Sequence, residues 1–155
     1  MTDSPHPLEA ARLEKLHKIE ALGLDPWGQR FDHHIHIAAA RDKCPTEQGT
    51  DGDAVRVAGR IMLRRGQGKV VFAALDDSSG RIQLFAPADV TPDFDDFKGL
   101  SLGDWIGVKG VMVKTRKGEL SVEVREWVML AEARRQFPDK WHGLSDPDLR
   151  YRQRY

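Results

Sequence analysis

Apolar and polar residues alternate along the middle of the chain, in five runs separated by turns rich in glycine. Every second side chain of a strand lies on the same face of a sheet, so this period predicts strands that bury one face. The strands are expected at residues 54–65, 69–75, 81–86, 104–115 and 119–130.

The first strand shows this alternation and its interruption. Its apolar side chains share one parity, and Gly59 breaks the series, as a bulge or tight bend does. In the fourth strand the apolar phase switches across Gly110, which also indicates a bulge. The apolar series of the first strand is Val55, Val57, Ile61 and Leu63, and that of the fifth is Leu120, Val122, Val124, Val128 and Leu130.

Helical spacing of apolar residues appears outside the strands. It predicts a helix over 8–22, which Gly23 and Pro26 end. Shorter helices are expected near 35–43 and within 87–103, between the third and fourth strands.

Three strands, a short helix and two more strands are the element order of an OB-fold, a five-stranded Greek-key barrel. An SH3-like barrel is the alternative, and the helix between strands three and four disfavours it. The chain therefore divides into an N-terminal extension over 1–53, a barrel over 54–130 and a linker over 131–155.

The overall composition excludes several classes of protein. The 155 residues carry 24 basic and 24 acidic side chains, so any nucleic-acid site must be a local patch. A single cysteine, Cys44, excludes an internal disulfide and fits a reducing compartment. No apolar run has the roughly 20 residues that a membrane span needs, and we expect a cytoplasmic protein.

The first three strands contain the candidate binding residues. No acidic residue occurs between Ala54 and Leu75. Phe72 has the polar parity of the second strand, and Gln83 lies on the matching face of the third. A base stacked on Phe72 would present its edge to the amide of Gln83. Stacking and edge contacts of this kind are typical of proteins that recognise single-stranded nucleic acid. The basic residues expected beside this face are Arg56, Arg60, Arg64, Arg65 and Lys69, of which Arg64 and Arg65 end the first strand as candidates for phosphate or base contact.

Other chemistry finds little support in the pattern. His33, His34 and His36 form a cluster, but no cysteine or histidine pair follows at zinc spacing. Residues 66–68 lack the lysine and the helix of a phosphate-binding loop. We therefore expect no catalytic residue, no metal site and no cofactor.

Four runs occur in this order along the chain: VAGRIMLRRGQGKVVF, GRIQLF, KTRKGELSV and FPDKWHGLSDPDLRYRQRY. Together they resemble the N-terminal anticodon-binding domain of bacterial lysyl-tRNA synthetase, a class II enzyme. Aspartyl and asparaginyl enzymes share the barrel but not the wording of the last run.

The resemblance implies roles for individual residues. Phe72 would stack the central uridine of the anticodon of tRNA-Lys, Gln83 would read that base, and Arg65 would assist. Glu119 of the GEL run would meet another anticodon base.

The resemblance also implies that these residues end where the family's catalytic domain begins. The chain alone is then expected to bind tRNA without aminoacylating it. ATP and Mg²⁺ would belong to the catalytic domain of the parent enzyme, which is expected to be a homodimer. The alternatives are a general single-stranded nucleic-acid-binding module and a structural domain that supports dimerisation.

Overall fold

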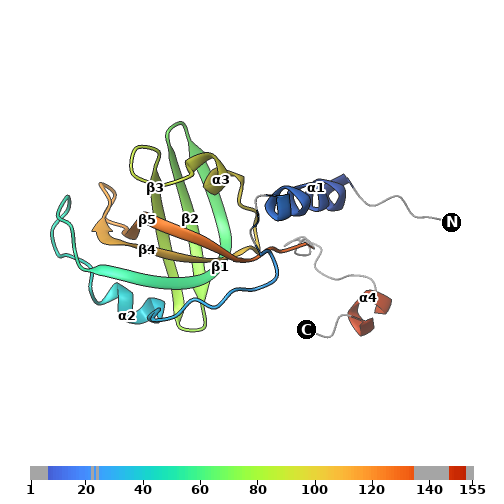
Figure 1. Cartoon of the computed structure of the whole chain (residues 1–155). Helices are drawn as coiled ribbons and strands as arrows, with labels where there is room; N and C mark the ends of the chain where they lie inside the picture. Colours follow the sequence, from blue (N-terminus) through green and yellow to red (C-terminus); the bar gives the residue numbers. More distant parts are fainter. Residues whose placement is uncertain (1–6, 22, 24, 135–146, 153–155) are drawn as a thin grey trace.

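The computed structural model describes residues 7–21, 23, 25–134 and 147–152. Five strands form a closed barrel in the order β1-β2-β3-β5-β4 (Figure 1). The strands are β1 Ala54–Gln67, β2 Val70–Asp77, β3 Gly80–Pro87, β4 Trp105–Lys114 and β5 Leu120–Ala131. The expected mainly-β barrel is confirmed, with the parallel β3–β5 pair that closes an OB-fold.

Among the described residues, four helices accompany the barrel: α1 Pro7–Ala21, α2 Ile37–Arg41, α3 Phe94–Gly99 and α4 Pro147–Arg152. The helix expected between the third and fourth strands is α3, and the N-terminal helix is α1. Of the expected linker over 131–155, residues 135–146 and 153–155 lie outside the described part. No helix within the described ranges has the length and apolarity to cross a membrane.

One long strand, β1, joins the two sides of the barrel. Its first half pairs with β4 and its second half pairs with β2. At the junction, a Cβ atom on Gly59 would lie 2.4 Å from the carbonyl oxygen of Asp76. Gly59 therefore permits a close approach of two backbones, and of the two features expected there, a bulge or a tight bend, the register shows no bulge.

The bulge in β1 lies three residues later. Ile61 is opposite Leu75, but Leu63 is opposite Ala74, so Met62 is the extra residue. An extra residue reverses the parity of everything that follows it in the strand. The expectation that Leu63 joins the buried face is wrong for this reason, and its side chain is 39% exposed.

Strand β5 changes phase in the same way. Lys109 pairs with Glu126 while Gly110 pairs with Val124, so the register shifts at Gly110 but the extra residue is Arg125 of β5. The phase switch expected in the fourth strand is wrong, because Ile106, Val108 and Met112 of β4 are all buried. Val128 is consequently only half-buried, and Met129 is buried in its place.

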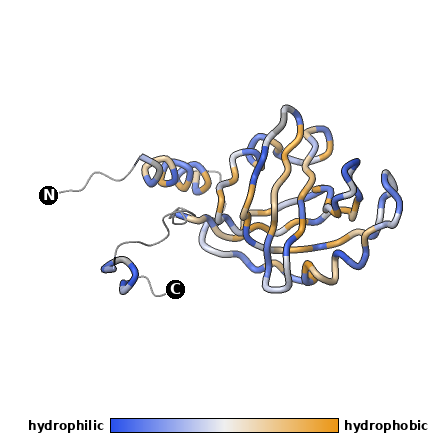
Figure 2. Tube along the Cα trace, turned by 180° about the vertical axis from the view of Figure 1, so that it is seen from behind, coloured by the Kyte–Doolittle hydropathy of each residue, from blue (hydrophilic) through white to orange (hydrophobic). Residues whose placement is uncertain are grey.

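The core fills the barrel with branched and aliphatic side chains from all five strands. In Figure 2 the hydrophobic positions alternate with hydrophilic ones along the strands. Phe97 of α3 is fully buried and meets the Trp127 ring edge-on at 5.5 Å, so this helix closes one side of the core. The fully buried strand residues include Val57, Ile61, Leu75, Ile82, Leu84, Ile106, Val108 and Met112.

Helix α1 is held against the barrel by an ion pair. Lys15 Nζ lies 2.6 Å from Oδ2 of Asp104, whose side chain is completely buried. The same carboxylate accepts hydrogen bonds from the backbone N–H groups of Ser101 and Ala133. Burial raises the pKa of the neighbouring Glu132 carboxyl, and the charge of Asp104 adds to that rise.

Asp77 ties α2 to the turn between β2 and β3. Oδ1 accepts hydrogen bonds from the N–H groups of Ser79 and Gly80 and from Ser79 Oγ, while Oδ2 accepts one from the N–H of Ile37. Burial alone would raise the pKa of Asp77, but these hydrogen bonds together outweigh burial and lower it.

We expect Asp77→Ala to lower the free energy of unfolding by about 1–3 kcal/mol, because hydrogen bonds to a charged acceptor are lost. The lowered pKa means that Asp77 stabilises the fold above its unfolded-state pKa, and that this stabilisation fades as pH falls through the folded-state pKa. Urea denaturation at neutral pH and at a series of acid pH values measures both effects.

The exposed Ser78 of the same turn offers a matched control, and Ser78→Ala should leave the unfolding free energy nearly unchanged. A difference between wild type and Asp77→Ala that stays constant into acid would contradict the assignment.

Candidate nucleic-acid interface

The outer side of β2, β3 and the end of β1 brings the candidate residues together. Residues directly opposite each other in an antiparallel pair point to the same face. Phe72 is opposite Arg65 on one side and Phe85 on the other, and Ala74 is opposite Gln83. We call this surface the β2–β3 face; it consists of Leu63, Arg65, Phe72, Ala74, Gln83 and Phe85.

Two aromatic rings form the centre of the β2–β3 face. The ring centroids of Phe72 and Phe85 are 5.5 Å apart and the rings are tilted by 32°. Both side chains are half-buried, so part of each remains accessible. Phe85 was assigned no role from the sequence, although its outward parity, shared with Gln83, was the available signal.

Gln83 lies beside the rings with its amide held in place. Nε2 donates a hydrogen bond of 2.9 Å to Oγ of Ser121, the residue opposite Gln83 in the parallel β3–β5 pair. Ser121 is completely buried, so this contact is made beneath the surface. Sequence reasoning missed Ser121, because parallel pairing between distant strands leaves no local signal.

The bulge at Met62 decides which of two adjacent arginines near the end of β1 joins the β2–β3 face. Arg65 is opposite Phe72 and therefore belongs to the β2–β3 face, whereas Arg64 is opposite the buried Ala73 and has the other parity. Both side chains are exposed. Without the extra residue, Arg64 would have faced the rings and Arg65 would have pointed toward the core.

Glu119 lies just before β5, at the edge of the same region. It is exposed, and its carbonyl oxygen accepts hydrogen bonds from the N–H and the hydroxyl of Thr115. Two residues later in the chain comes Ser121, the partner of Gln83. Ser121 Oγ also donates to the carbonyl oxygen of Glu119, so Glu119 contacts the residue that holds the Gln83 amide.

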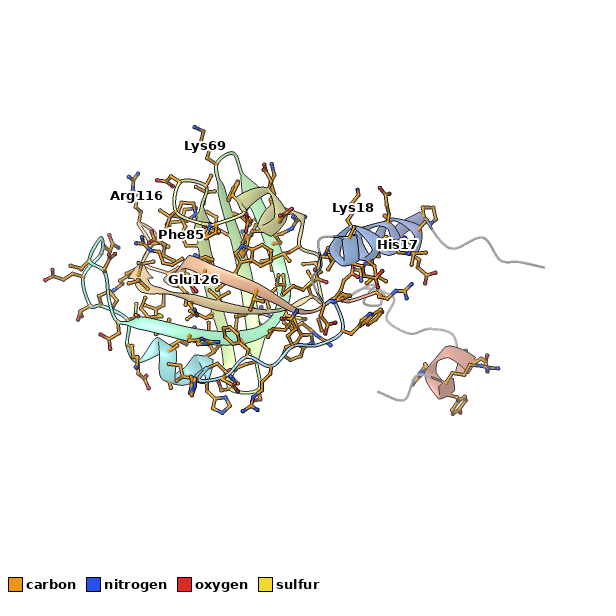
Figure 3. All side chains as sticks on the ribbon, viewed as in Figure 1. His17, Lys18, Lys69, Phe85, Arg116 and Glu126 are labelled. Carbon is orange, nitrogen blue, oxygen red and sulfur yellow. The ribbon has the colours of Figure 1, made fainter. Side chains whose placement is uncertain are left out.

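Exposed cations border this region. Lys69 lies in the β1–β2 turn and Arg116 in the β4–β5 turn, and both side chains extend away from the barrel (Figure 3). Arg56 and Arg60 do not join them, contrary to expectation. They lie in the half of β1 that pairs with β4, where Arg56 stacks on Phe31 at 4.0 Å and Arg60 on Trp105 at 5.2 Å.

Two of the three clustered histidines contact other groups of the protein. His34 Nδ1 is 2.7 Å from the carbonyl oxygen of Phe31, and His36 Nδ1 is 3.6 Å from Asp77 Oδ2. In the described part of the chain, no three His, Cys, Asp or Glu side chains are placed to hold a metal ion. Cys44 packs against the core, and burial raises the pKa of its thiol.

This geometry agrees with the comparison to known families. Residues 55–130 match the family model of the tRNA anticodon type, described as an OB-fold nucleic acid binding domain. The barrel belongs to this family. The match covers nearly the whole span from β1 to β5, including every residue of the β2–β3 face.

Curated relatives extend the similarity beyond the barrel. A lysine–tRNA ligase of Moorella thermoacetica is 42% identical over 155 residues, covering 99% of this chain and 31% of the relative. Those of Clostridium perfringens and Staphylococcus aureus are 43% and 39% identical, over 94% and 100% of this chain. The resemblance to lysyl-tRNA synthetase is confirmed, and the chain spans about a third of the length of these relatives.

The opposite parities of the two arginines predict different effects on RNA binding by the anticodon-type OB-fold. Arg65→Ala should weaken binding to an RNA stem-loop by about 1–3 kcal/mol, as expected for loss of a base-edge contact. Arg64→Ala should weaken all sequences equally and lower the salt slope by about one, as expected for loss of a phosphate contact. Titrations of both variants at several salt concentrations distinguish the two patterns, and an identical response would contradict the different contacts assigned to Arg64 and Arg65.

Proposed function

We propose that this chain binds the anticodon loop of tRNA-Lys, with the central uridine stacked on Phe72 and read by Gln83. The observation that carries the proposal is the β2–β3 face itself. It places an accessible aromatic pair, a fixed amide and Arg65 on one surface of an anticodon-type OB-fold. Stacking and edge reading of unpaired bases are how proteins recognise single-stranded loops.

The chemistry of the amide supports uridine as the base. A glutamine amide offers one acceptor, its carbonyl oxygen, and two N–H donors. The edge of uridine offers an N3–H donor beside a carbonyl acceptor. Since Nε2 of Gln83 uses one N–H on Ser121, its second N–H and its Oε1 suit that edge.

The distribution of charged side chains supports an anionic ligand. Arg65 shares the face of the rings, and the exposed side chains of Arg64, Lys69 and Arg116 lie at the end of β1 and in the β1–β2 and β4–β5 turns, while the whole chain carries no net charge. A local group of cations attracts phosphates without making the protein a general polyanion binder. We assign Glu119 to a hydrogen bond with a second anticodon base. An ionised carboxylate only accepts hydrogen bonds, so beside RNA it is favourable where a base donates one to it.

We propose binding as the role of these 155 residues. The ligase reaction named for the relatives, with its ATP and Mg²⁺, is assigned to the two thirds of their length that lie outside the match. We also propose that the parent enzyme is a cytoplasmic homodimer, as the resemblance implies.

A general single-stranded nucleic-acid-binding module is the second candidate. It is favoured by the aromatic pair and the surrounding cations, because every base has a face to stack and every nucleotide has a phosphate. The two candidates differ in base preference, which only the anticodon reader should show strongly.

We expect Phe72→Ala to weaken stem-loop binding by about 1–3 kcal/mol whatever the central base, because a stacking platform is lost. Gln83→Ala should instead reduce the preference for uridine over cytidine by about 1–3 kcal/mol, because a base-edge contact is lost. Fluorescence anisotropy titrations with stem-loops that carry uridine or cytidine at the central position measure both.

Phe72→Trp retains a flat ring and serves as the matched control, which should keep most of the affinity. If Phe72→Ala and Gln83→Ala both leave affinity and base preference unchanged, the RNA does not use the β2–β3 face. If wild type binds uridine and cytidine loops equally, the general binding module is the better description.

A further inference from the structure

A chain of hydrogen bonds connects the amide of Gln83 to the backbone of the β4–β5 turn. Gln83 Nε2 donates to Ser121 Oγ at 2.9 Å, and Ser121 Oγ lies 3.4 Å from the carbonyl oxygen of Glu119. Ser121 is completely buried, so its hydroxyl depends on these protein partners. Parallel pairing of Gln83 with Ser121 brings the two side chains together where β3 and β5 close the barrel.

The direction of this chain follows from what each group can donate. A carbonyl oxygen only accepts, so the hydroxyl proton of Ser121 is directed to Glu119. The lone pairs of Ser121 Oγ then face Gln83, which must present its N–H. The same oxygen also accepts hydrogen bonds from the N–H and the hydroxyl of Thr115, at 3.0 and 3.2 Å.

We propose that Ser121 is a positioning residue that fixes the orientation of the Gln83 amide and so makes the site select uridine over cytidine. The inference rests on the proposed function, in which Gln83 reads a base. Uridine presents a donor, N3–H, next to an acceptor, O4. Cytidine presents the reverse order, an N4 amino donor in place of O4 and an acceptor at N3.

A free glutamine amide would accept either base, since a half-turn about its last bond exchanges the oxygen and the nitrogen. Ser121 opposes that half-turn. After the turn, Gln83 Oε1 would face an Oγ atom whose proton is already directed to Glu119, and two lone-pair groups would meet without a hydrogen bond.

Burial distinguishes this role from direct contact with RNA. Ser121 has no exposed surface, whereas Gln83 is only half-buried. Any effect of Ser121 on base preference must therefore pass through a neighbour, and Gln83 is the neighbour on the β2–β3 face.

The test compares affinities of the full 155-residue chain for two stem-loop RNAs that differ only in uridine or cytidine at the central position. Ser121→Ala should lower the ratio of uridine to cytidine affinity by about fivefold or more, the lower end of a base-edge contact. The change should come mainly from tighter cytidine binding. In the Gln83→Ala background, Ser121→Ala should leave the ratio unchanged.

Two further variants separate positioning from general loosening. Thr115→Val removes a hydrogen bond to the same Glu119 carbonyl without touching Gln83, and it should keep the wild-type ratio. Ser121→Thr retains the hydroxyl and should restore most of the preference that Ser121→Ala loses. Equal losses in Thr115→Val and Ser121→Ala would overturn the proposal.

The outcomes separate the two levels of inference. If Gln83→Ala loses the uridine preference and Ser121→Ala keeps it, the positioning role is wrong and the proposed function stands. If Gln83→Ala keeps the preference, both are wrong. Should Ser121→Ala not fold, NMR of wild type decides: nuclear Overhauser effects between the Gln83 amide protons and the Ser121 β protons support the inference, and an amide turned the other way overturns it.

Discussion

The extra residue at Met62 is the constraint on which the rest of the surface depends. A strand whose side chains alternate strictly can serve only one buried face, and β1 must fill the core at Ile61 and contribute to the outer face four residues later. The bulge resolves this conflict by reversing the parity between the two positions. Arg65 thereby reaches the row of Phe72 and Phe85, and Leu63 loses its place in the core.

Barrel closure also requires strand backbones to approach closely at two points, and a glycine allows this at each. Gly59 faces the carbonyl of Asp76, and a Cβ on Gly110 would lie 2.0 Å from the carbonyl oxygen of Glu123. No larger residue fits at either place without moving a strand. Asp77 and Asp104 then fix the outer helices by accepting several hydrogen bonds each, so the barrel is held at the turns as well as through its core.

The sequence predicts strands and parity well where alternation is unbroken, as in β2 and β3. Phe72 and Gln83 were placed on one outer face from this pattern alone, and the register agrees. Prediction fails where the residue type gives no sign of a bulge. Met62 is the extra residue but is neither glycine nor polar, whereas Gly59 allows two backbones to approach and is not a bulge. The Gln83–Ser121 contact also escapes, because it spans 38 residues and depends on a parallel pair that only the closed barrel creates.

That parallel pair links recognition to closure. β3 and β5 are in register at only three positions, and these include Gln83 opposite Ser121 and Phe85 opposite Glu123. The shortest seam of the barrel therefore lies directly beneath the Gln83 amide and beside the ring of Phe85. In the proposed function, a ligand that orders the amide would also favour the closed seam, and a change that loosens the seam would free the amide to turn. If Gln83 reads a base as proposed, base preference and local stability would be coupled here, because the same hydrogen bonds would serve both.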